Sequence, residues 1–336
     1  MTGKLICFES KGRAVLQHFE IPELKPGEAL IENDYTVVSA GTEVANLIGL
    51  PNTSASGKFP WHPGYCGAGR VAAVGEGVES LKIGDRVITN WGGHRSHMVR
   101  TAASFTKIED DRVDSLDASF AVIASFSFLG VRKLRIELGE SAMIAGQGLL
   151  GVLALQIARL SGAIPVIVSD FDPKRRELAL SLGADHAFDP GDKDLVGKIM
   201  EATGGKGVNA VVEVTGAAVA LQQALEYVAW QGRISLLGCT RISDVPIDFY
   251  KFVHQRGISI IGANTFARPK TESQPGQWTE QDDYRTFLKL AAAGRMHVRP
   301  LISEIVSPED APTIYTRLAE MKNPPLGIVF DWSKIR

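Results

Sequence analysis

Short apolar runs separated by turn residues fill the first part of the chain. The runs KLICFE, AVLQHFE, EALIENDYTVV and GRVAAVG alternate or are rich in β-branched residues, and the turns between them contain KG, KPGE and GEG. Such runs bounded by glycine and proline are typical of β-strands. The pattern therefore predicts a β-rich first domain over residues 1–121.

Buried apolar runs alternate with amphipathic segments over residues 122–264. The strand-like runs include SAMIA, IPVIVSD, DHAFD, VNAVVEV, RISLLG and ISIIGA, and the helical segments include LLGVLALQIARLSG, PKRRELALSLGA, DLVGKIMEATGG and ALQQALEYVAWQG. Pro173 in a first turn and Gly183 near a helix end fit this reading. Strands that alternate with helices in this way form βαβ units, so the pattern predicts an α/β domain with a doubly wound parallel sheet.

The remaining segment, 265–336, begins with the polar stretch FARPKTESQPGQWTEQDD. Helices are expected near 283–293 and 308–321, followed by the strand-like run GIVFDW. About seventy residues are few for an independent domain, because a small chain buries little of its surface. We therefore expect this segment to pack onto the β-rich first domain.

Composition narrows the functional classes. The chain has 336 residues, with 36 Lys and Arg against 38 Asp and Glu and a net charge of −2, so no broad charge favours nucleic acid or an anionic membrane surface. Glu9 and Lys11 interrupt any apolar leader, and the most apolar run, MIAGQGLLGVLALQIARL, contains Gln147, Gln156 and Arg159. Three widely spaced cysteines form no disulfide framework. We expect a cytoplasmic protein that acts on a small molecule.

A glycine-rich motif follows the first strand of the α/β domain. It reads Gly146-Gln147-Gly148-Leu149-Leu150-Gly151, it precedes a helix, and Asp170 ends the next strand. The first glycine permits a tight turn, the second lets the backbone approach a pyrophosphate, and the third lets helix and strand pack closely. The helix N-terminus then offers N–H groups to the phosphates. This context predicts a dinucleotide site.

Asp170 predicts the choice of dinucleotide. A carboxylate at this position accepts hydrogen bonds from the adenosine ribose and repels a 2′-phosphate, which favours NAD(H) over NADP(H). Arg175 and Arg176 argue for the opposite preference, unless they form a solvated helix face with Glu177. We expect NAD(H) as the cofactor, with Arg175 among the residues near it.

The order of motifs resembles the medium-chain dehydrogenase/reductase superfamily over nearly the whole chain. The similar motifs are SAGTE (39–43), PGYCGAGRVAAVGEGV (63–78), GDRV (84–87), GQGLLG (146–151), VSDFDPKRRELALSLGA (168–184), VEVTG (212–216) and GRISLLG (232–238). The resemblance implies a GroES-like catalytic domain, formed by both flanks, around an inserted Rossmann domain. It also implies cofactor contacts at Thr215 and Gly238, and it favours the polyol, threonine and bacteriochlorophyllide dehydrogenase branch.

The last strand of the Rossmann domain, Gly257–Gly262, bears on assembly. It is apolar on both faces, and an unpaired edge strand of this kind favours aggregation. Members of the resembled family commonly pair this strand across a two-fold axis. We therefore expect a homodimer or a homotetramer.

The metal ligands of zinc-dependent members are replaced in this chain. Ala40 stands at the position of a ligand Cys and Tyr65 at that of a ligand His, and residues between Asp117 and Glu137 include no acid, Cys or His. A catalytic zinc needs three protein ligands. We therefore predict a zinc-free member with no metal site, although Cys66, Glu43, His62 and His94 are residues from which another site could be built.

Four side chains are candidates for the chemistry that zinc otherwise supports. Thr42 matches the position of a hydroxyl that bonds the substrate oxygen, Tyr65 can donate to an alkoxide, and His94 has the pKa range of an acid–base group. Glu43 could pair with a nearby cation. The alternatives are a turn hydroxyl for Thr42, a space-filling ring for Tyr65, a locally bonded loop histidine for His94 and a structural ion pair for Glu43.

Together these features predict an enzyme, an NAD-dependent alcohol dehydrogenase that works without zinc. It would oxidise a secondary alcohol of a polyol or sugar derivative by hydride transfer to nicotinamide. The alternatives are an NAD(P)H-dependent quinone or enone reductase and a catalytically silent dinucleotide-binding protein.

Overall fold

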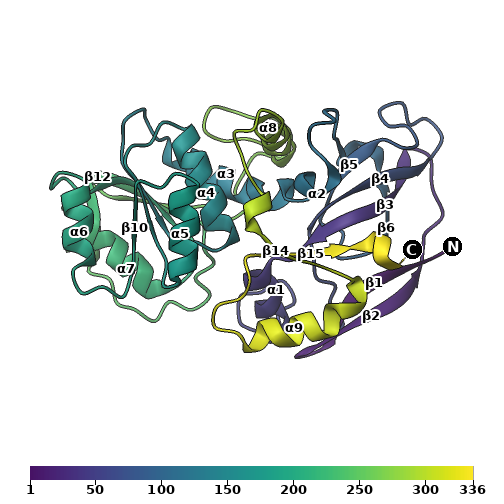
Figure 1. The fold of residues 1–336 in the computed structure, drawn as a ribbon, viewed down its shortest axis with the longest axis horizontal. Helices are drawn as coiled ribbons and strands as arrows, with labels where there is room; N and C mark the ends of the chain where they lie inside the picture. Colours follow the sequence, from purple (N-terminus) through teal and green to yellow (C-terminus); the bar gives the residue numbers. More distant parts are fainter. Residues whose placement is uncertain (336) are drawn as a thin grey trace. The chain divides into compact units, whose positions relative to one another are not determined.

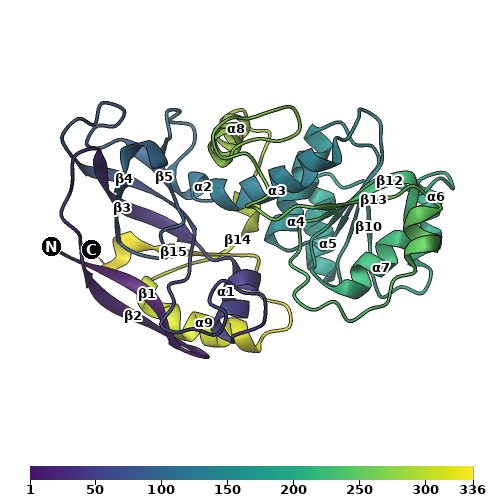
Figure 2. The ribbon, with the colours of Figure 1, turned by 180° about the vertical axis from the view of Figure 1, so that it is seen from behind.

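The computed structural model describes residues 1–335 and divides into two compact units. Unit 1 combines Met1–Ile123 with the segment from Tyr284 onward, and unit 2 is Ala124–Asp283. The sequence pattern placed the second division at residue 265, so the two differ over residues 265–283. Figures 1 and 2 show unit 1 as the part rich in β-strands and unit 2 as a layered α/β fold.

Unit 1 is built around an antiparallel sheet to which both ends of the chain contribute. The sheet has the order β14 (Ile302–Val306), β15 (Gly327–Asp331), β3 (Glu28–Val37), β4 (Cys66–Val74), β5 (Arg86–Asn90) and β7 (Thr106–Lys107), while β6 (His97–Thr101) also pairs with β3. Strands β14 and β15 run parallel to each other. The pairing of β15 with β3, Val329 opposite Val37, confirms that the C-terminal segment packs onto the first domain.

A second layer of unit 1 covers one end of this sheet. Strands β1 (Thr2–Ser10) and β2 (Arg13–Glu20) form an antiparallel pair, and helices α1 (Ala40–Leu47) and α9 (Ala311–Glu320) pack with them. Their apolar side chains share one core, which includes Phe8, Tyr315, Phe330 and Trp332. The apolar pattern did not predict α1, because its sequence AGTEVANL contains only one full turn of apolar periodicity and a glycine.

Unit 2 has the sheet order expected of a doubly wound fold. All neighbouring strands are parallel in the order β10 (His186–Phe188), β9 (Val166–Ser169), β8 (Ala142–Ala145), β11 (Val208–Glu213), β12 (Val228–Leu236) and β13 (Ser259–Gly262). Helices α4 (Leu149–Leu160) and α5 (Pro173–Ser181) cover one face, and α6 (Leu195–Ala202) and α7 (Ala218–Tyr227) cover the other (Figures 1 and 2). The chain order reverses between β8 and β11, which is the ligand-binding point of such sheets.

Helix α7 is shorter than the pattern predicts. The apolar periodicity of ALQQALEYVAWQG extends to Trp230, but the helix ends at Tyr227 and β12 begins at Val228. Val228 is paired with Val208 of β11 in the parallel sheet. This pairing ends the helix at Tyr227, although the apolar periodicity of the segment continues. Gln231 then adopts a φ of 58° and donates its N–H to the Arg256 carbonyl.

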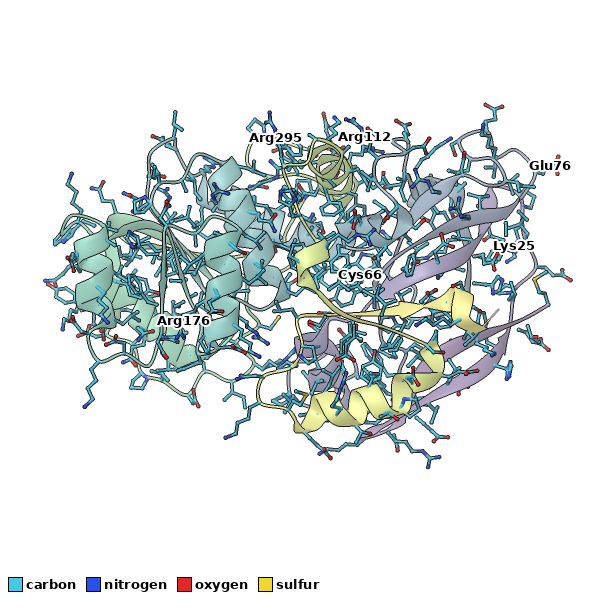
Figure 3. All side chains as sticks on the ribbon, in the orientation of Figure 1. Lys25, Cys66, Glu76, Arg112, Arg176 and Arg295 are labelled. Atoms are coloured by element: carbon cyan, nitrogen blue, oxygen red, sulfur yellow. The ribbon has the colours of Figure 1, made fainter. Side chains whose placement is uncertain are left out.

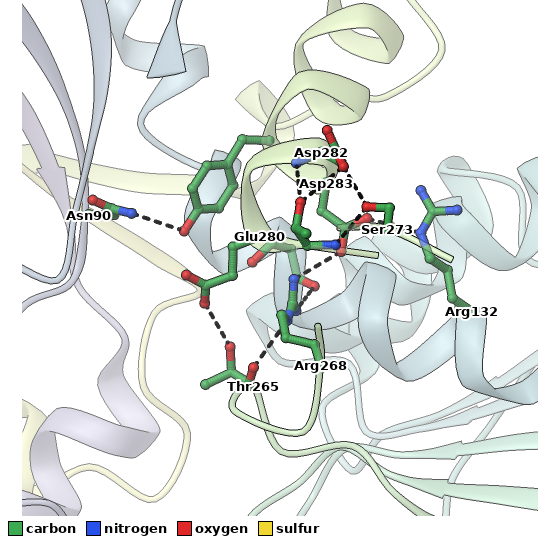
Figure 4. A network of polar contacts seen from close by, with 11 residues as sticks. Asn90, Arg132, Thr265, Arg268, Ser273, Glu280, Asp282 and Asp283 are labelled. Carbon is green, nitrogen blue, oxygen red and sulfur yellow. Dashed lines mark hydrogen bonds and ion pairs between the residues drawn. The ribbon is translucent and has the colours of Figure 1, made fainter. Parts of the chain in front are cut away.

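A buried ion triad attaches residues 265–283 to helix α3 (Ala121–Leu134). Arg132 Nε donates to Asp283 Oδ1 at 2.9 Å, and Arg268 Nη1 donates to Asp283 Oδ2 at 3.0 Å (Figure 4). Arg268 also donates to the carbonyls of Thr265 and Ser125. The triad explains why this polar stretch belongs to unit 2, while α8 (Glu280–Ala292) carries the chain back into unit 1.

The helices of residues 1–335 are all too short or too polar to span a lipid bilayer.

Candidate active site

The glycine motif forms the turn between β8 and α4. Gly146 has a φ of +99°, and a Cβ at Gly151 would lie 1.9 Å from the Gly146 carbonyl oxygen, so both positions require glycine. A Cβ at Gly148, by contrast, would meet no other atom within 4 Å. Gly148 is also the N-cap of α4, with Leu149 as the first helical residue. The turn therefore presents an open side and free helical N–H groups, which fits a pyrophosphate.

The loop that follows β11 packs against this turn. A Cβ at Gly146 would lie 2.9 Å from Thr215 Cγ2, and a Cβ at Gly238 would lie 2.3 Å from the Gly216 nitrogen. Glu213, which is fully buried, accepts from the N–H groups of Thr215 and Gly216 and from the Thr215 hydroxyl. The loops after β8, β11 and β12 thus meet at the reversal point, and they place Thr215 and Gly238 beside the glycine turn.

Asp170 is held at the end of β9 by the backbone. Its Oδ2 accepts from Gln147 N–H at 2.8 Å, and its Oδ1 accepts from Asp172 N–H at 2.9 Å. The carboxylate therefore lies against the glycine turn in a defined orientation, where a ribose of a dinucleotide on the turn would meet it. These residues together fit a dinucleotide, with the glycine turn for its pyrophosphate and Asp170 for its ribose.

The two arginines of α5 fold back toward Asp170 instead of forming a solvated face. Arg175 Nη1 lies 3.9 Å from Asp170 Oδ2, and Arg176 Nη1 donates to the Asp170 carbonyl at 2.7 Å. Figure 3 labels Arg176 in unit 2. A solvated face with Glu177 is therefore wrong for this pair, because both guanidinium groups find acceptors at the end of β9.

Tyr65 and the first turn of α1 form a cluster of hydroxyls in unit 1. The Tyr65 ring stacks on Trp91 with centroids 5.3 Å apart, and the hydroxyls of Ser39 and Thr42 are the neighbours that act to lower the pKa of its phenol. Desolvation raises the pKa of Tyr65 well above its ordinary value, although these two hydroxyls oppose the shift. The phenol therefore stays protonated near neutral pH and can act as a donor.

Glu43, which lies on α1 next to Thr42, is fully buried in a second polar cluster. Its Oε2 accepts from Tyr315 of α9 at 2.5 Å and lies 3.1 Å from His94 Nε2, and its Oε1 accepts from Ser39 N–H at 3.0 Å. His94 Nδ1 lies 2.8 Å from Thr36 Oγ1. These residues come from segments that are far apart in the sequence, and all of them belong to unit 1.

Thr36 and Trp332 extend this cluster beyond His94. Trp332 Nε1 donates to Thr36 Oγ1 at 2.9 Å, and the same Thr36 hydroxyl lies within hydrogen-bond distance of His94 Nδ1. On the other side of the ring, His94 Nε2 faces the Glu43 carboxylate. Each of these buried polar groups therefore has a partner inside the cluster.

The position of His94 favours the alternative of a locally bonded histidine over that of an acid–base group, and Glu43 is one of its two bonding partners. Only 1% of His94 is exposed, both ring nitrogens have partners, and the ring packs edge-on against Phe330 with centroids 5.1 Å apart. The physical reason is the neighbouring core of unit 1, which surrounds the imidazole with apolar side chains. This geometry suits a positioning role and not direct contact with a substrate.

The described residues do not fit a zinc ion. Residues 1–335 contain no group of three or more His, Cys, Asp or Glu that is placed to hold a metal. The Glu43 carboxylate and both ring nitrogens of His94 already have hydrogen-bond partners in each other, in Thr36 and in Tyr315. His62 is exposed, and Cys66 is buried at the start of β4 (Figure 3), so neither extends this pair into a ligand set.

Sequence reasoning missed three members of the buried cluster. Thr36, Tyr315 and Trp332 carry no motif, and their partners lie up to 296 residues away. The sequence shows only that a tyrosine or tryptophan on a buried face needs a hydrogen-bond partner for its O–H or N–H group. It does not show which residue that partner is.

Comparison with known proteins follows the same division of the chain. The family model for the alcohol dehydrogenase GroES-like domain matches residues 25–121, and the model for zinc-binding dehydrogenase matches residues 150–288. An L-threonine 3-dehydrogenase of Pyrococcus abyssi (strain GE5 / Orsay) is 30% identical over 317 residues, which cover 86% of this chain and 87% of that protein.

Solved structures share the fold over nearly the whole chain. Galactitol-1-phosphate dehydrogenase from Escherichia coli aligns with a TM-score of 0.84 at 17% identity, and 2R,3R-butanediol dehydrogenase from Bacillus subtilis with a TM-score of 0.82 at 20% identity. Each alignment covers 98% of this chain and 99% of the other. With its glycine turn, its Asp170 and its split β-rich unit, the chain belongs to the medium-chain dehydrogenase/reductase superfamily, a family of oxidoreductases that bind a nicotinamide dinucleotide.

Proposed function

We propose that the protein is an NAD(H)-dependent dehydrogenase that oxidises a secondary alcohol of a polar substrate, such as a polyol or sugar derivative, without zinc. Two observations carry this proposal: the dinucleotide turn of unit 2, and a buried polar cluster of unit 1 in which Glu43 and His94 already have hydrogen-bond partners among other side chains. The relatives named as threonine, butanediol and galactitol-1-phosphate dehydrogenases support the substrate class, since all three names denote alcohols.

The preference for NAD(H) is proposed from Asp170. Two backbone N–H groups hold its carboxylate against the glycine turn, so it cannot rotate away without losing both bonds. A 2′-phosphate beside this carboxylate would meet a like charge at short range. Arg175 Nη1 lies 3.9 Å from Asp170 Oδ2 and partly offsets the charge of the carboxylate. It therefore reduces the discrimination against NADP(H) without removing it.

Two side chains of the protein are proposed to hydrogen-bond the alcohol oxygen and to carry away its proton. A bound nicotinamide supplies the hydride acceptor. Tyr65 stays protonated because desolvation raises its pKa, so it acts as a hydrogen-bond donor to the reacting oxygen and not as the base. Thr42, whose hydroxyl acts to lower the pKa of that phenol, provides a group through which the alcohol proton leaves toward solvent.

The primary test is an assay of the purified protein with NAD⁺ and a panel of polyols and sugar derivatives, with and without a chelator. We expect nicotinamide reduction that the chelator leaves unchanged, and less than one zinc per chain by elemental analysis. One tightly held zinc per chain together with loss of activity in chelator would contradict the metal-free proposal. Reduction of enones or quinones with NADPH, and no alcohol oxidation, would favour the reductase alternative.

Tyr65→Phe tests the donor role, because it keeps the ring stacked on Trp91 and removes only the hydroxyl. Loss of one oxyanion-type donor costs on the order of 10²–10³ in rate. We expect kcat to fall more than about tenfold, with unchanged affinity for NAD(H). Unchanged kcat would leave Tyr65 as a space-filling side chain.

Assembly through β13 is proposed as well. This strand is an edge of the six-stranded sheet, and its residues Ser259–Gly262 are partly or fully exposed. Because an unpaired edge offers free N–H and C=O groups, we propose that two copies pair there in a homodimer, or in a tetramer built from such dimers. A strictly monomeric species by light scattering at micromolar concentration would contradict this.

A further inference from the structure

We propose that Arg176 is a positioning residue for the choice of dinucleotide: it clamps the turn between β9 and α5 and thereby holds the Asp170 carboxylate in place. This inference rests on the proposed preference for NAD(H). It reverses the role that the sequence suggests for Arg176, because an arginine that faces the adenosine ribose ordinarily favours the 2′-phosphate of NADP(H).

The first step is the contact between Arg176 and the backbone at the end of β9. Its Nη1 donates to the Asp170 carbonyl at 2.7 Å and to the Phe171 carbonyl at 3.1 Å. Consecutive carbonyls of an extended strand point in opposite directions, so one nitrogen can bind both only where the chain turns. The two hydrogen bonds therefore fix the backbone of the turn directly after the Asp170 side chain.

The second step is the way in which Arg176 is itself held. Its Nη1 lies 3.5 Å from Oδ2 of Asp189, in the loop after β10, and Asp189 Oδ1 accepts from the Gly191 N–H at 2.8 Å. Only 22% of the Arg176 side chain is exposed. Because Nη1 is already used by two carbonyls and a carboxylate, Arg176 serves to join the loops after β9 and β10 and does not reach for a phosphate.

The third step is the effect of this clamp on Asp170. The Asp170 carboxylate accepts from the N–H groups of Gln147 and Asp172 at 2.8 and 2.9 Å. The Asp172 N–H and the Phe171 carbonyl belong to one peptide group, so Asp170 and Arg176 bind its two opposite ends. If Arg176 is removed, this peptide group can rotate, and Asp170 Oδ1 loses its fixed donor.

A fixed carboxylate discriminates between dinucleotides better than a mobile one. A 2′-phosphate must approach a charge that cannot turn away, which weakens NADPH binding. The hydroxyls of an NADH ribose meet oxygens that are already oriented, so little side-chain entropy is lost on binding. Loss of the clamp should therefore weaken the binding of NADH and strengthen the binding of NADPH.

Fluorescence titration of the purified protein with NADH and NADPH tests the clamp in Arg176→Met. We expect the ratio of NADH affinity to NADPH affinity to narrow about fivefold, the size of one hydrogen bond. The matched control is Arg159→Met, because Arg159 Nη1 donates to the Leu182 carbonyl at the other end of α5 at 3.0 Å. This control should keep the ratio of the unmodified protein.

Three results of the titration would overturn the proposal. A wider ratio in Arg176→Met would show that Arg176 attracts the 2′-phosphate of NADPH. Equal losses of affinity for both dinucleotides would show a role in stability alone. A ratio that narrows as much in Arg159→Met as in Arg176→Met would show that no specific contact of Arg176 is responsible.

Amide hydrogen exchange without cofactor separates this inference from the proposed function. The N–H groups of Gln147 and Asp172 should exchange about fivefold faster in Arg176→Met, and at the unmodified rate in Arg159→Met. Unchanged exchange of both groups in folded Arg176→Met would refute the clamp. Faster exchange, in a protein whose unmodified form binds NADH and NADPH equally, would uphold the clamp and refute the proposed preference for NAD(H).

Discussion

The dinucleotide turn of unit 2 and the Glu43 cluster of unit 1 both present polar groups in a buried setting, but the chain builds them in opposite ways. The turn uses six consecutive residues and one aspartate at the end of the next strand. The cluster unites Thr36, Glu43, His94, Tyr315 and Trp332, which lie on separate strands, helices and loops.

The difference lies in what each region demands of its residues. The turn depends on backbone shape, so glycine is required where a Cβ would strike another atom, and the requirement is visible in the sequence. The cluster depends on side-chain partners, and each of its polar atoms needs a complement that the fold brings from far away. Local backbone constraints can be read from a motif, whereas distant hydrogen-bond partners cannot.

The largest expected effect comes from removing the centre of the cluster. Glu43→Ala leaves the Ser39 N–H, the Tyr315 hydroxyl and the His94 ring without their shared acceptor. A buried donor left without its acceptor costs about 1–3 kcal/mol, and three groups lose their acceptor here. We expect a loss of this size in the free energy of unfolding, measured by urea denaturation. A loss below about 1 kcal/mol would show that the cluster does not depend on its carboxylate.

The next effect distinguishes two glycines of the turn. A Cβ at Gly151 would strike the Gly146 carbonyl oxygen, so Gly151→Ala should destabilise unit 2 by about 1–3 kcal/mol and weaken NADH binding. Gly148→Ala should leave the melting temperature unchanged, because its Cβ meets open space, and should weaken only NADH binding. Calorimetry and NADH fluorescence titration measure the two quantities. Equal melting temperatures for both variants would contradict the claim that a Cβ is excluded at Gly151 and tolerated at Gly148.

A smaller effect is expected for the selectivity between cofactors. The unmodified protein should bind NAD(H) at least about tenfold more tightly than NADP(H), or ~1.4 kcal/mol. Asp170→Ser should narrow this ratio, because the repelling carboxylate is gone and Arg175 remains beside the site. Isothermal titration with both cofactors gives the ratio. Equal affinities in the unmodified protein would contradict the assignment of Asp170.

The smallest effect concerns Glu213, a buried carboxylate of unit 2 whose pKa is raised by desolvation. A raised pKa means that the folded state holds its proton to a higher pH than the unfolded state does. The contribution of Glu213 to the free energy of unfolding is therefore fully present below the ordinary glutamate pKa of about 4.5, and it is lost as the pH rises through the pKa of the folded state. As the pH rises from 4.5 to 7, the free energy of unfolding should therefore fall less for Glu213→Gln than for the unmodified protein. The free energy of unfolding would be measured by chemical denaturation at several pH values. If it changed with pH equally in both proteins, the hydrogen bonds from Thr215 and Gly216 would fully offset the desolvation of Glu213.

The sequence by itself determined the architecture of unit 2 and the class of its ligand, a dinucleotide. The strands from β8 to β13 and the helices α4 and α5 follow from apolar periodicity and turn residues, and the glycine motif with Asp170 predicted the dinucleotide turn that the comparisons support. It also predicted that the C-terminal segment returns to the first domain. These features rest on local backbone and side-chain preferences, which neighbouring residues set.

Only the tertiary structure decided the remaining features. Helix α1 lacks a strong pattern of its own, and the end of α7 is set by the pairing of Val228 with Val208. Residues 265–283 belong to unit 2 because Arg132 and Arg268 share Asp283. The partners of Glu43 and His94 include Thr36 of β3 and Tyr315 of α9, and Thr36 in turn accepts from Trp332. The physical reason is general: a buried polar group must be satisfied, but any segment that the fold brings near can satisfy it.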